Sequence, residues 1–154
     1  MDRIDVRLYD TLGCTVVATV LLQSLRDKFP RAEISVYTAY PDLLAGLQEI
    51  NGVYDAHAHT LERYDVDLTG YLEIRKPQES KPFRHLAVHM LEMAEEQLGD
   101  RIIGTLKRDF LPVVNLTQQE EQNAREIVQS LSRGKPVVWL QTKTRQPKKN
   151  WPRE

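Results

Sequence analysis

The sequence has one cysteine, almost no net charge and no long hydrophobic run, and each shortage excludes a class of protein. The single Cys14 excludes an internal disulfide and a zinc site built from several cysteines, and it fits a reducing compartment. A formal net charge of -1 argues against a broad nucleic-acid surface, which needs a basic face. No apolar stretch has the length of a signal peptide core or a membrane span. We therefore expect a cytoplasmic protein with no nucleic-acid partner.

The composition is that of an ordinary globular domain. Hydrophobic residues make up 41% of the chain and charged residues 28%, both near the averages for soluble proteins. A length of 154 residues is enough for one domain with its own core. The sequence contains no internal repeat and no low-complexity stretch, so we expect one core.

Short runs with strand alternation are followed by longer runs with helical spacing. Strands are predicted at residues 4–8, 34–38, 53–59, 66–72 and 137–141. Helices are predicted at residues 15–29, 42–50 and 86–98, and from the Thr117–Glu120 capping box to just before Gly134. Parallel strands need crossover connections, and helices supply them. The order therefore predicts an α/β fold: a Rossmann-like parallel sheet with helices on both faces.

The first loop of interest is Asp10 to Thr15, because ligands of an open parallel sheet bind beyond the carboxyl ends of its strands. It places Gly13, Cys14 and Thr15 at the start of a helix. Unpaired N–H groups and the positive end of the helix dipole there favour an anion or an acceptor oxygen. A purely structural interpretation is also open, in which Gly13 makes the bend and Thr15 caps the helix.

The second loop of interest, Gln141 to Trp151, follows the predicted last strand. It sets Thr142, Thr144, Lys148 and Lys149 close together in the sequence. Lysine supplies charge and threonine supplies directed donors, which suits a diphosphate. The alternative is a solvated basic end of the chain.

Asp55, His57 and His59 stand at alternate positions of the predicted strand 53–59. On a strand they would share one face, which is a possible arrangement of metal ligands. A metal-dependent hydrolase is therefore one hypothesis. The simpler interpretation is the polar edge of a strand, and on it we predict no metal site.

Several segments of the sequence are similar, in order, to those of one known family. The stretch VRLYDTLGCTVVATVLLQSLRDKFPRAEISV resembles the opening of the lipopolysaccharide heptosyltransferase family, where a first strand leads through a Leu-Gly-Asp turn into a helix that ends in Phe-Pro. Later segments resemble the family in the same order: VYDAHAH, YDVDLTG, PFRHLAVHMLEM, LTQQEEQNAREIV and KPVVWLQTKTRQPKKNWPRE. The last of these contains Lys149-Asn150-Trp151-Pro152, which is similar to the family's Lys-x-Trp-Pro signature. The resemblance covers nearly the whole chain.

This resemblance implies an inverting glycosyltransferase of the GT-B type, in which two Rossmann-like domains face a cleft. The N-terminal domain holds the glycan acceptor, the C-terminal domain holds the ADP-sugar donor, and no metal or other cofactor is required. Residues 1–141 would form the acceptor-side domain, and residues 142–154 would begin the interdomain linker and donor-side loop. We expect the donor domain to be absent from this chain, which alone would be inactive.

The resemblance also implies roles for particular residues. The family's general base is the aspartate of the Leu-Gly-Asp turn, and the matching position here is Cys14. A thiolate at a helix N-terminus could act as a base, and Asp10 offers a carboxylate at the other end of the turn. Lys149 matches the lysine that holds the donor diphosphate, with Thr144 as a phosphate neighbour. The candidate catalytic residues are therefore Asp10 and Cys14.

Three further hypotheses concern function and partners. The replacement of the family's aspartate by Cys14 favours, as an alternative, a catalytically inactive module that binds a sugar or a partner protein. An isolated half would expose an apolar surface near residues 142–151, so a homodimer is expected. Peripheral contact with the inner membrane is a further prediction from the family.

Overall fold

The computed structural model describes residues 1–8, 10–70, 85–99, 102 and 104–132. The chain divides into two compact units, Met1–Asn115 and Leu116–Glu154. The predicted domain boundary between residues 141 and 142 lies outside the described residues and stays a prediction. The predicted strand 137–141 lies outside the described residues.

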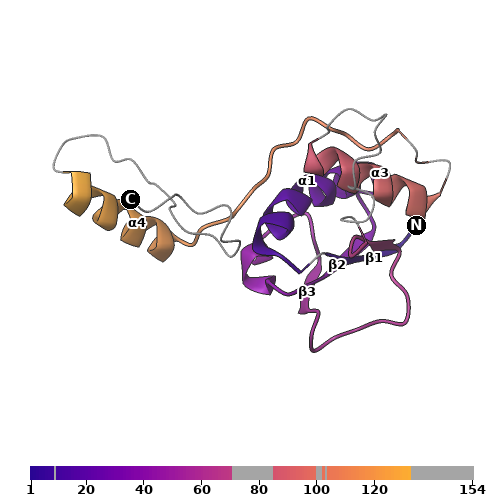
Figure 1. Cartoon of the computed structure of the whole chain (residues 1–154), viewed down its shortest axis with the longest axis horizontal. Coiled ribbons are helices and arrows are strands. Elements are labelled where there is room, and N and C mark those ends of the chain that lie inside the picture. Colours follow the sequence, from indigo (N-terminus) through magenta and orange to yellow (C-terminus); the bar gives the residue numbers. More distant parts are fainter. Residues whose placement is uncertain (9, 71–84, 100–101, 103, 133–154) are drawn as a thin grey trace, which may run out of the picture. The chain divides into compact units, whose positions relative to one another are not determined.

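The first unit is built on a four-stranded parallel sheet (Figure 1). Its strands are β1 (Arg3–Arg7), β2 (Glu33–Thr38), β3 (Gly52–Asp55) and β4 (Val66–Asp67). They lie in the order β3-β2-β1-β4, and β1 pairs in parallel with both β2 and β4. This is the order of the first four strands of a Rossmann fold. The predicted α/β class with a Rossmann-like parallel sheet is confirmed.

Two helices, α1 (Leu12–Lys28) and α3 (Leu86–Leu98), lie together on one side of the sheet (Figure 1). Helix α1 ends at Phe29, whose N–H donates to the Leu25 carbonyl at 2.8 Å, and Pro30 prevents its continuation. Helix α3 is capped by His85 and ends at Gly99, which has a φ of 104° that favours glycine. None of the described helices is both long and apolar enough to cross a membrane.

The face of the sheet under these helices is apolar. In register across the four strands lie Val53, Val36, Val6 and Val66. Branched side chains pack well on a pleated surface, and three of the four valines are completely buried. The fully buried side chains that fill the space between sheet and helices include Ile4, Leu8, Leu21, Leu22, Leu25, Ile34, Leu68, Met90 and Leu91. This core fixes the carboxyl ends of the strands relative to the start of α1.

The predicted helix 42–50 is wrong. The chain forms only a 3-10 turn, η1 (Pro41–Leu44). Gly46 then adopts a φ of 75°, a left-handed conformation that a continuing helix does not allow. Leu44 and Leu47 are nevertheless buried, so these two apolar residues pack into the core without being part of a helix.

Two predicted strands are shorter than expected. The predicted strand 53–59 ends at Asp55, whose carboxylate accepts a hydrogen bond from the His57 N–H at 2.8 Å. Aspartate bonded in this way to the backbone two residues on makes a turn, so His57 and His59 do not lie on a strand. Within its described residues, 66–70, the predicted strand 66–72 pairs with β1 only over Val66–Asp67.

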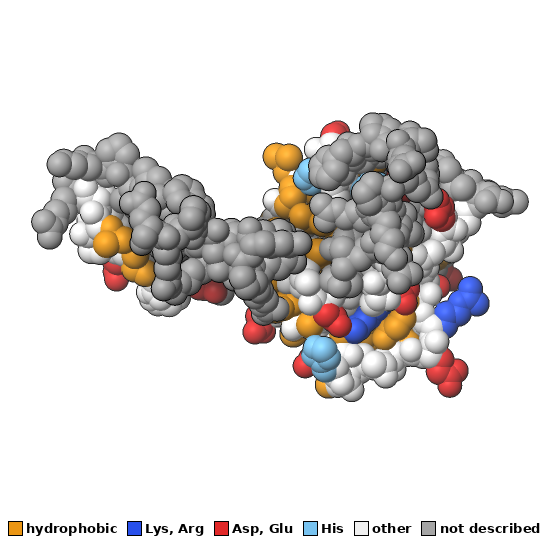
Figure 2. Space-filling model, in the orientation of Figure 1, with side chains coloured by type: hydrophobic (Ala, Val, Ile, Leu, Met, Phe, Trp, Pro, Cys, Tyr) orange, Lys and Arg blue, Asp and Glu red, His pale blue; other side chains and the backbone are white. Residues whose placement is uncertain are grey.

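The described part of the second unit is helix α4 (Gln118–Ser132), which confirms the predicted capping box. The Glu120 carboxylate accepts from the Thr117 N–H at 2.7 Å and from the Thr117 hydroxyl at 2.8 Å, and the Glu120 N–H donates to that hydroxyl at 3.2 Å. No residue of α4 is buried, and Figure 2 shows hydrophobic side chains on its surface. The large ones are Ile127, Val128 and Leu131.

The capping box predicts that acid weakens the start of α4. Hydrogen bonds from the Thr117 backbone and hydroxyl hold the pKa of Glu120 below its ordinary value. The stabilisation is therefore present above the ordinary glutamate pKa and is lost as the pH falls through the lower pKa of the folded helix. On acidification we expect the backbone amide NMR signals of the first turn to move toward random-coil chemical shifts. At neutral pH the same signals should lie nearer to random-coil chemical shifts in Glu120→Gln than in the wild type. Unchanged signals in Glu120→Gln would contradict a stabilising capping box.

Candidate functional site

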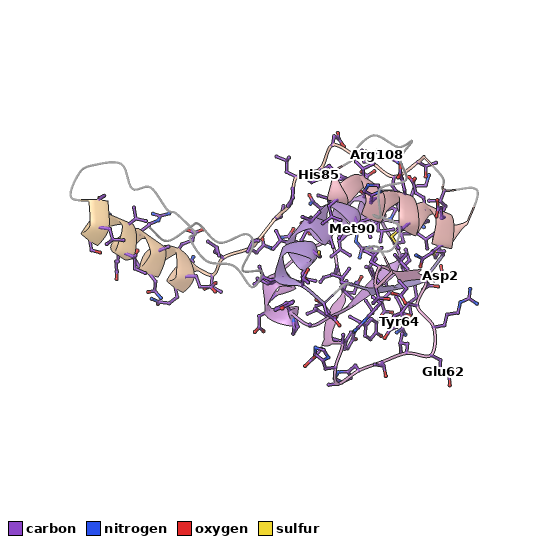
Figure 3. The ribbon with its side chains drawn as sticks, viewed as in Figure 1. Asp2, Glu62, Tyr64, His85, Met90 and Arg108 are labelled. Atoms are coloured by element: carbon purple, nitrogen blue, oxygen red, sulfur yellow. The ribbon has the colours of Figure 1, made fainter. Side chains whose placement is uncertain are left out.

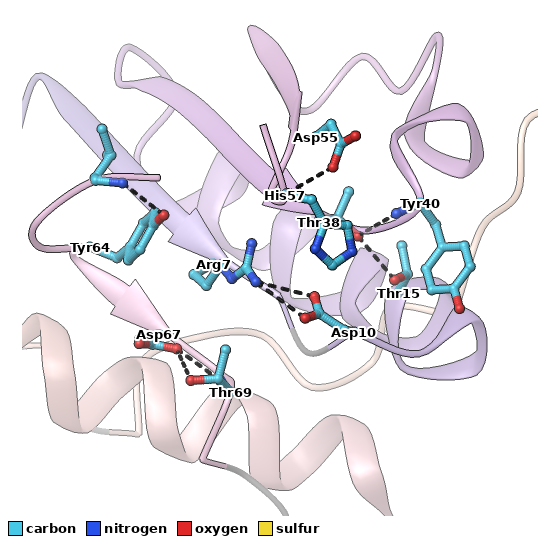
Figure 4. A network of polar contacts seen from close by, with 11 residues as sticks. Arg7, Asp10, Thr15, Thr38, Tyr40, Asp55, His57, Tyr64, Asp67 and Thr69 are labelled. Atoms are coloured by element: carbon cyan, nitrogen blue, oxygen red, sulfur yellow. Dashed lines mark hydrogen bonds and ion pairs between the residues drawn. The ribbon is translucent and has the colours of Figure 1, made fainter. Parts of the chain in front are cut away.

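The carboxyl ends of β1 and β2 meet the start of α1, and a network of polar side chains gathers there (Figure 4). Arg7, the last residue of β1, forms an ion pair with Asp10: Nη2 lies 3.3 Å from Oδ1 and 3.2 Å from Oδ2. The Arg7 side chain is 13% exposed, whereas that of Asp10 is 41% exposed. The ion pair therefore holds a solvent-accessible carboxylate at the edge where ligands of this fold bind.

Gly13 lies in the first turn of α1 beside open space. No atom is found within 4 Å of the position that a Cβ would occupy there. Its φ is not positive, so the backbone does not require glycine. Gly13 therefore does not make the bend, because it lies inside α1 with a helical backbone, and the open space beside it is solvent.

Thr15 is fully buried and ties α1 to the end of β2. Its hydroxyl donates to the Thr11 carbonyl at 3.1 Å and lies 3.2 Å from the Thr38 hydroxyl, which accepts from the Tyr40 N–H at 3.2 Å. The predicted capping role is wrong, because the N-cap residue is Thr11, which makes no side-chain cap. Thr15 fixes the position of the turn, and in this structure its hydroxyl is engaged inside the protein.

Cys14, at the position of the family's aspartate, is 7% exposed and belongs to the hydrophobic core. The two candidate catalytic residues thus differ sharply in accessibility. Asp10 presents a carboxylate to solvent, and Cys14 presents little of its surface. The other predicted binding residues, Thr144 and Lys149, lie outside the described residues.

Asp55, His57 and His59 do not share one face of a strand. Asp55 is occupied by the turn that follows it, and His57 and His59 lie on that turn. Among the residues that the structure describes, no group of three or more histidine, cysteine, aspartate or glutamate side chains could hold a metal ion. The arrangement that suggested a metal-dependent hydrolase is therefore not found at these three residues.

The face of the sheet opposite the core is polar, and it was not predicted from the sequence. One residue beyond the valines, the register places Tyr54, Tyr37, Arg7 and Asp67 in a row across the four strands. Figure 3 shows Tyr64 on the side of the sheet away from Met90 of α3, and its ring packs against this row at Tyr37. The alternation of apolar and polar residues in β1 was a usable signal, because it places Arg7 on the face opposite the core.

Two features of this row bear on its chemistry. The Nη1 atom of Arg7 is buried and has no hydrogen-bond partner within the described chain. Buried unpaired donors are rare because they cost free energy, and they call for a structural or functional explanation. Burial raises the pKa of Tyr37 above its ordinary value, and the nearby Asp5 carboxylate raises it further. Tyr37 therefore stays protonated and donates to Asp5, with its hydroxyl 3.3 Å from Oδ1.

Comparison with known proteins gives one informative likeness. No family model matches the sequence. No curated protein matches it either. The structure is similar to the crystal structure of the glycosyl transferase family 9 protein from Veillonella parvula DSM 2008, with a TM-score of 0.68 and 17% sequence identity. The two share a fold.

The match covers 99% of this chain and 57% of the Veillonella parvula chain. This chain therefore corresponds to a little more than half of that protein. At this identity the likeness extends to the arrangement of the strands and helices and does not reach the chemistry of single residues. The role of the Arg7–Asp10 pair therefore rests on the geometry of the pair itself.

Proposed function

We propose that this chain provides the acceptor-side half of an inverting glycosyltransferase, similar to the heptosyltransferases, that moves a sugar from a nucleotide-sugar to a bacterial glycan. The observation that carries the proposal is the exposed Asp10 carboxylate, held by Arg7 at the carboxyl edge of the sheet beside the open space at Gly13. The fold shared with a family 9 glycosyl transferase supports it. The GT-B arrangement, with a donor domain facing this edge, is part of the proposal.

In the proposed reaction Asp10 acts as the general base. An acceptor hydroxyl enters the space above Gly13, and Asp10 accepts its proton as the oxygen bonds to the anomeric carbon of the donor. The bond between that carbon and the diphosphate breaks, and the diphosphate leaves with the electron pair. Because the attack comes from the face opposite the leaving group, the configuration inverts. The reaction consumes no cofactor and requires no metal.

The remaining assignments follow from the same proposal. Arg7 is a positioning residue, because its contact with both oxygens of Asp10 fixes the orientation of the carboxylate. Lys149 and Thr144 would hold the donor diphosphate. The protein would act in the cytoplasm, with peripheral contact to the inner membrane where its acceptor lies, and would associate with a donor domain or with a second copy of itself.

A second candidate function is an inactive sugar-binding or partner-binding module. The burial of Cys14 favours it, because the residue that matches the family's base presents almost no surface to a substrate. On this hypothesis the turn at Gly13 would still bind a glycan, and Asp10 would take no proton.

A transfer assay separates the two candidates. We expect the 154-residue chain to bind lipopolysaccharide core oligosaccharide in isothermal titration and to release no ADP from an ADP-sugar. Adding the donor-binding half of the protein should restore ADP release and incorporation of labelled sugar. The control is the donor half alone, which should release no ADP in the presence of acceptor. If the combined halves bind the oligosaccharide but transfer no sugar, the proposed transferase function is overturned and the binding-module hypothesis is supported.

A further inference from the structure

The face of the sheet away from α1 and α3 carries an aromatic cluster. The rings of Tyr37 and Tyr54 are stacked, with centroids 5.1 Å apart and an interplanar angle of 22°. Tyr64 packs edge-on against Tyr37 at 5.2 Å, and the His59 ring lies 5.8 Å from that of Tyr54. We call Tyr37, Tyr54, Tyr64 and His59 the aromatic platform. Such a cluster offers flat apolar surface together with polar groups at its edges.

Gly52 allows the Tyr54 ring to lie close against its own strand. A Cβ at residue 52 would stand 2.9 Å from the Tyr54 hydroxyl and 3.0 Å and 3.1 Å from the ring atoms Cε2 and Cζ. Any side chain there would displace the ring. The ring is therefore folded back over β3 beside Tyr37, and Tyr54 remains 37% exposed. The outermost ring of the platform is open to a bound molecule.

Hydrogen-bonding groups surround these rings. Asp5 accepts from the Tyr37 hydroxyl and from Arg3, whose side chain is 54% exposed. Asp65 accepts from the Asp5 N–H at 2.9 Å, and Asp55 directly follows Tyr54. Arg7, which lies beside Tyr37 and pairs with Asp10, is a second cation, so two arginines face four carboxylates and the neighbourhood carries an excess of negative charge.

We propose that the aromatic platform binds a neutral pyranose ring of a glycan. The C–H groups on one face of a pyranose pack on an aromatic ring, and its hydroxyls suit carboxylate acceptors and imidazole at the ring edge. A nucleotide also stacks on aromatic rings, but its phosphates would be repelled by Asp5, Asp55 and Asp65. The acidic surroundings therefore favour an uncharged sugar.

The platform is continuous with the Arg7–Asp10 pair. In register, Tyr54 lies beside Tyr37, and Tyr37 lies beside Arg7. Adjacent strands are about 4.8 Å apart, so the row from Tyr54 to Arg7 spans about 10 Å. Because Tyr37 is only 4% exposed, a glycan of a few residues would contact the platform mainly at the Tyr54 ring and extend from there toward Asp10. This last point rests on the proposed function, because it takes the bound glycan to be the acceptor.

Titration of the 154-residue chain with a neutral oligosaccharide, free of phosphate and of acidic sugars, tests the proposal, with ADP as the competing probe. We expect Tyr54→Leu, which keeps apolar bulk but lacks a flat ring, to weaken binding about tenfold. Gly52→Ala should weaken binding in the same direction, because it displaces the Tyr54 ring. Tyr54→Phe should keep the wild-type affinity, and the ring signals of Tyr54 should shift on titration.

Leu111→Ala is the matched control, since Leu111 is an exposed apolar residue of the same unit and should leave the affinity unchanged. Circular dichroism shows whether each variant folds. If Tyr54→Leu does not fold, the affinity of Gly52→Ala tests the proposal instead. The proposal is overturned if the wild-type chain binds no saccharide, if the folded variants bind as tightly as the wild type, or if ADP displaces the saccharide. If the platform variants leave saccharide binding unchanged while sugar transfer still depends on Asp10, this inference is refuted and the proposed function stands.

Discussion

Replacing Asp10 by asparagine is expected to lower the kcat of the proposed sugar transfer by about 10²- to 10⁴-fold, the usual contribution of a general base. Asparagine keeps the size of the side chain and an oxygen for Arg7, but it cannot accept the proton of the acceptor hydroxyl. The affinity for the acceptor should change little, because the binding surface is preserved. The measurement is steady-state kinetics of the chain combined with the proposed donor-binding half.

Cys14→Ser is the control for Asp10→Asn. A serine hydroxyl is a far weaker base than a thiolate, so this variant would lose transfer if Cys14 were the base. Because Cys14 is 7% exposed and packed in the core, we expect Cys14→Ser to keep most of the activity of the wild type. Full activity in Asp10→Asn together with loss in Cys14→Ser would reverse the assignment of the base.

Arg108→Ala is expected to destabilise the first unit by about 3 kcal/mol, which corresponds to a fall in Tm of about 10 °C. Its partner Glu95 on α3 is 2% exposed, and the two side chains meet at 2.7 Å (Nη2 to Oε2) and 3.2 Å (Nη1 to Oε1). Without Arg108 the buried carboxylate would keep only backbone donors such as the Leu106 N–H. Urea denaturation measures the loss.

The neighbouring residue supplies a matched control. Lys107 pairs with Asp27 at 2.7 Å, but both side chains are largely exposed, so Lys107→Ala should change the stability little. Glu95→Gln should lower the free energy of unfolding less than Arg108→Ala does, because the Arg108 side chain is 36% exposed and can reach water. Equal losses in Arg108→Ala and Lys107→Ala would contradict the importance of the buried pair.

The same pair predicts a dependence on pH. Burial alone would raise the pKa of Glu95, but hydrogen bonds from Arg108 and from the Gly104 and Leu106 backbone outweigh it, so the pKa lies below its ordinary value. A lowered pKa in the folded state stabilises the protein above the ordinary glutamate pKa, and the contribution disappears as the pH falls through the folded-state pKa. The acid-induced loss of stability should be smaller in Arg108→Ala.

Much of the fold could be predicted because several elements carry a local pattern. The alternation in β1 and the helical spacing in α1 and α3 each place one apolar face toward a core, and these elements lie where they were expected. The capping box at the start of α4 was equally visible, since its bonds join residues three apart. Interactions so close in the sequence do not depend on the rest of the fold.

The errors lie where one residue ended an element early. Gly46 broke the predicted helix 42–50 by taking a left-handed conformation, and Asp55 ended β3 by bonding to the His57 N–H. Hydrophobic spacing continued past both residues, so the pattern alone extended the elements too far. In each case the turn chemistry of the single residue prevailed over the periodicity around it.

The candidate site was predicted only in part. The turn from Asp10 to Thr15 was placed correctly at the edge of the sheet, because a ligand site follows from the position of a loop after a strand. The roles within the turn were not predictable, since they depend on contacts across the sheet: Thr15 with Thr38, and Asp10 with Arg7. The assignment of Lys149 and Thr144 to the donor stays a prediction.

By itself, the sequence determined the α/β class, the order of the main elements and the loop that carries Asp10, because these depend on periodicity and on residues near one another in the chain. Only the tertiary structure decided the strand order β3-β2-β1-β4 and the register that aligns Tyr54, Tyr37 and Arg7. Register depends on pairing between segments separated by tens of residues, and moving a strand by one residue would exchange its two faces. The burial of Cys14 and the exposure of Asp10 also depend on the tertiary structure.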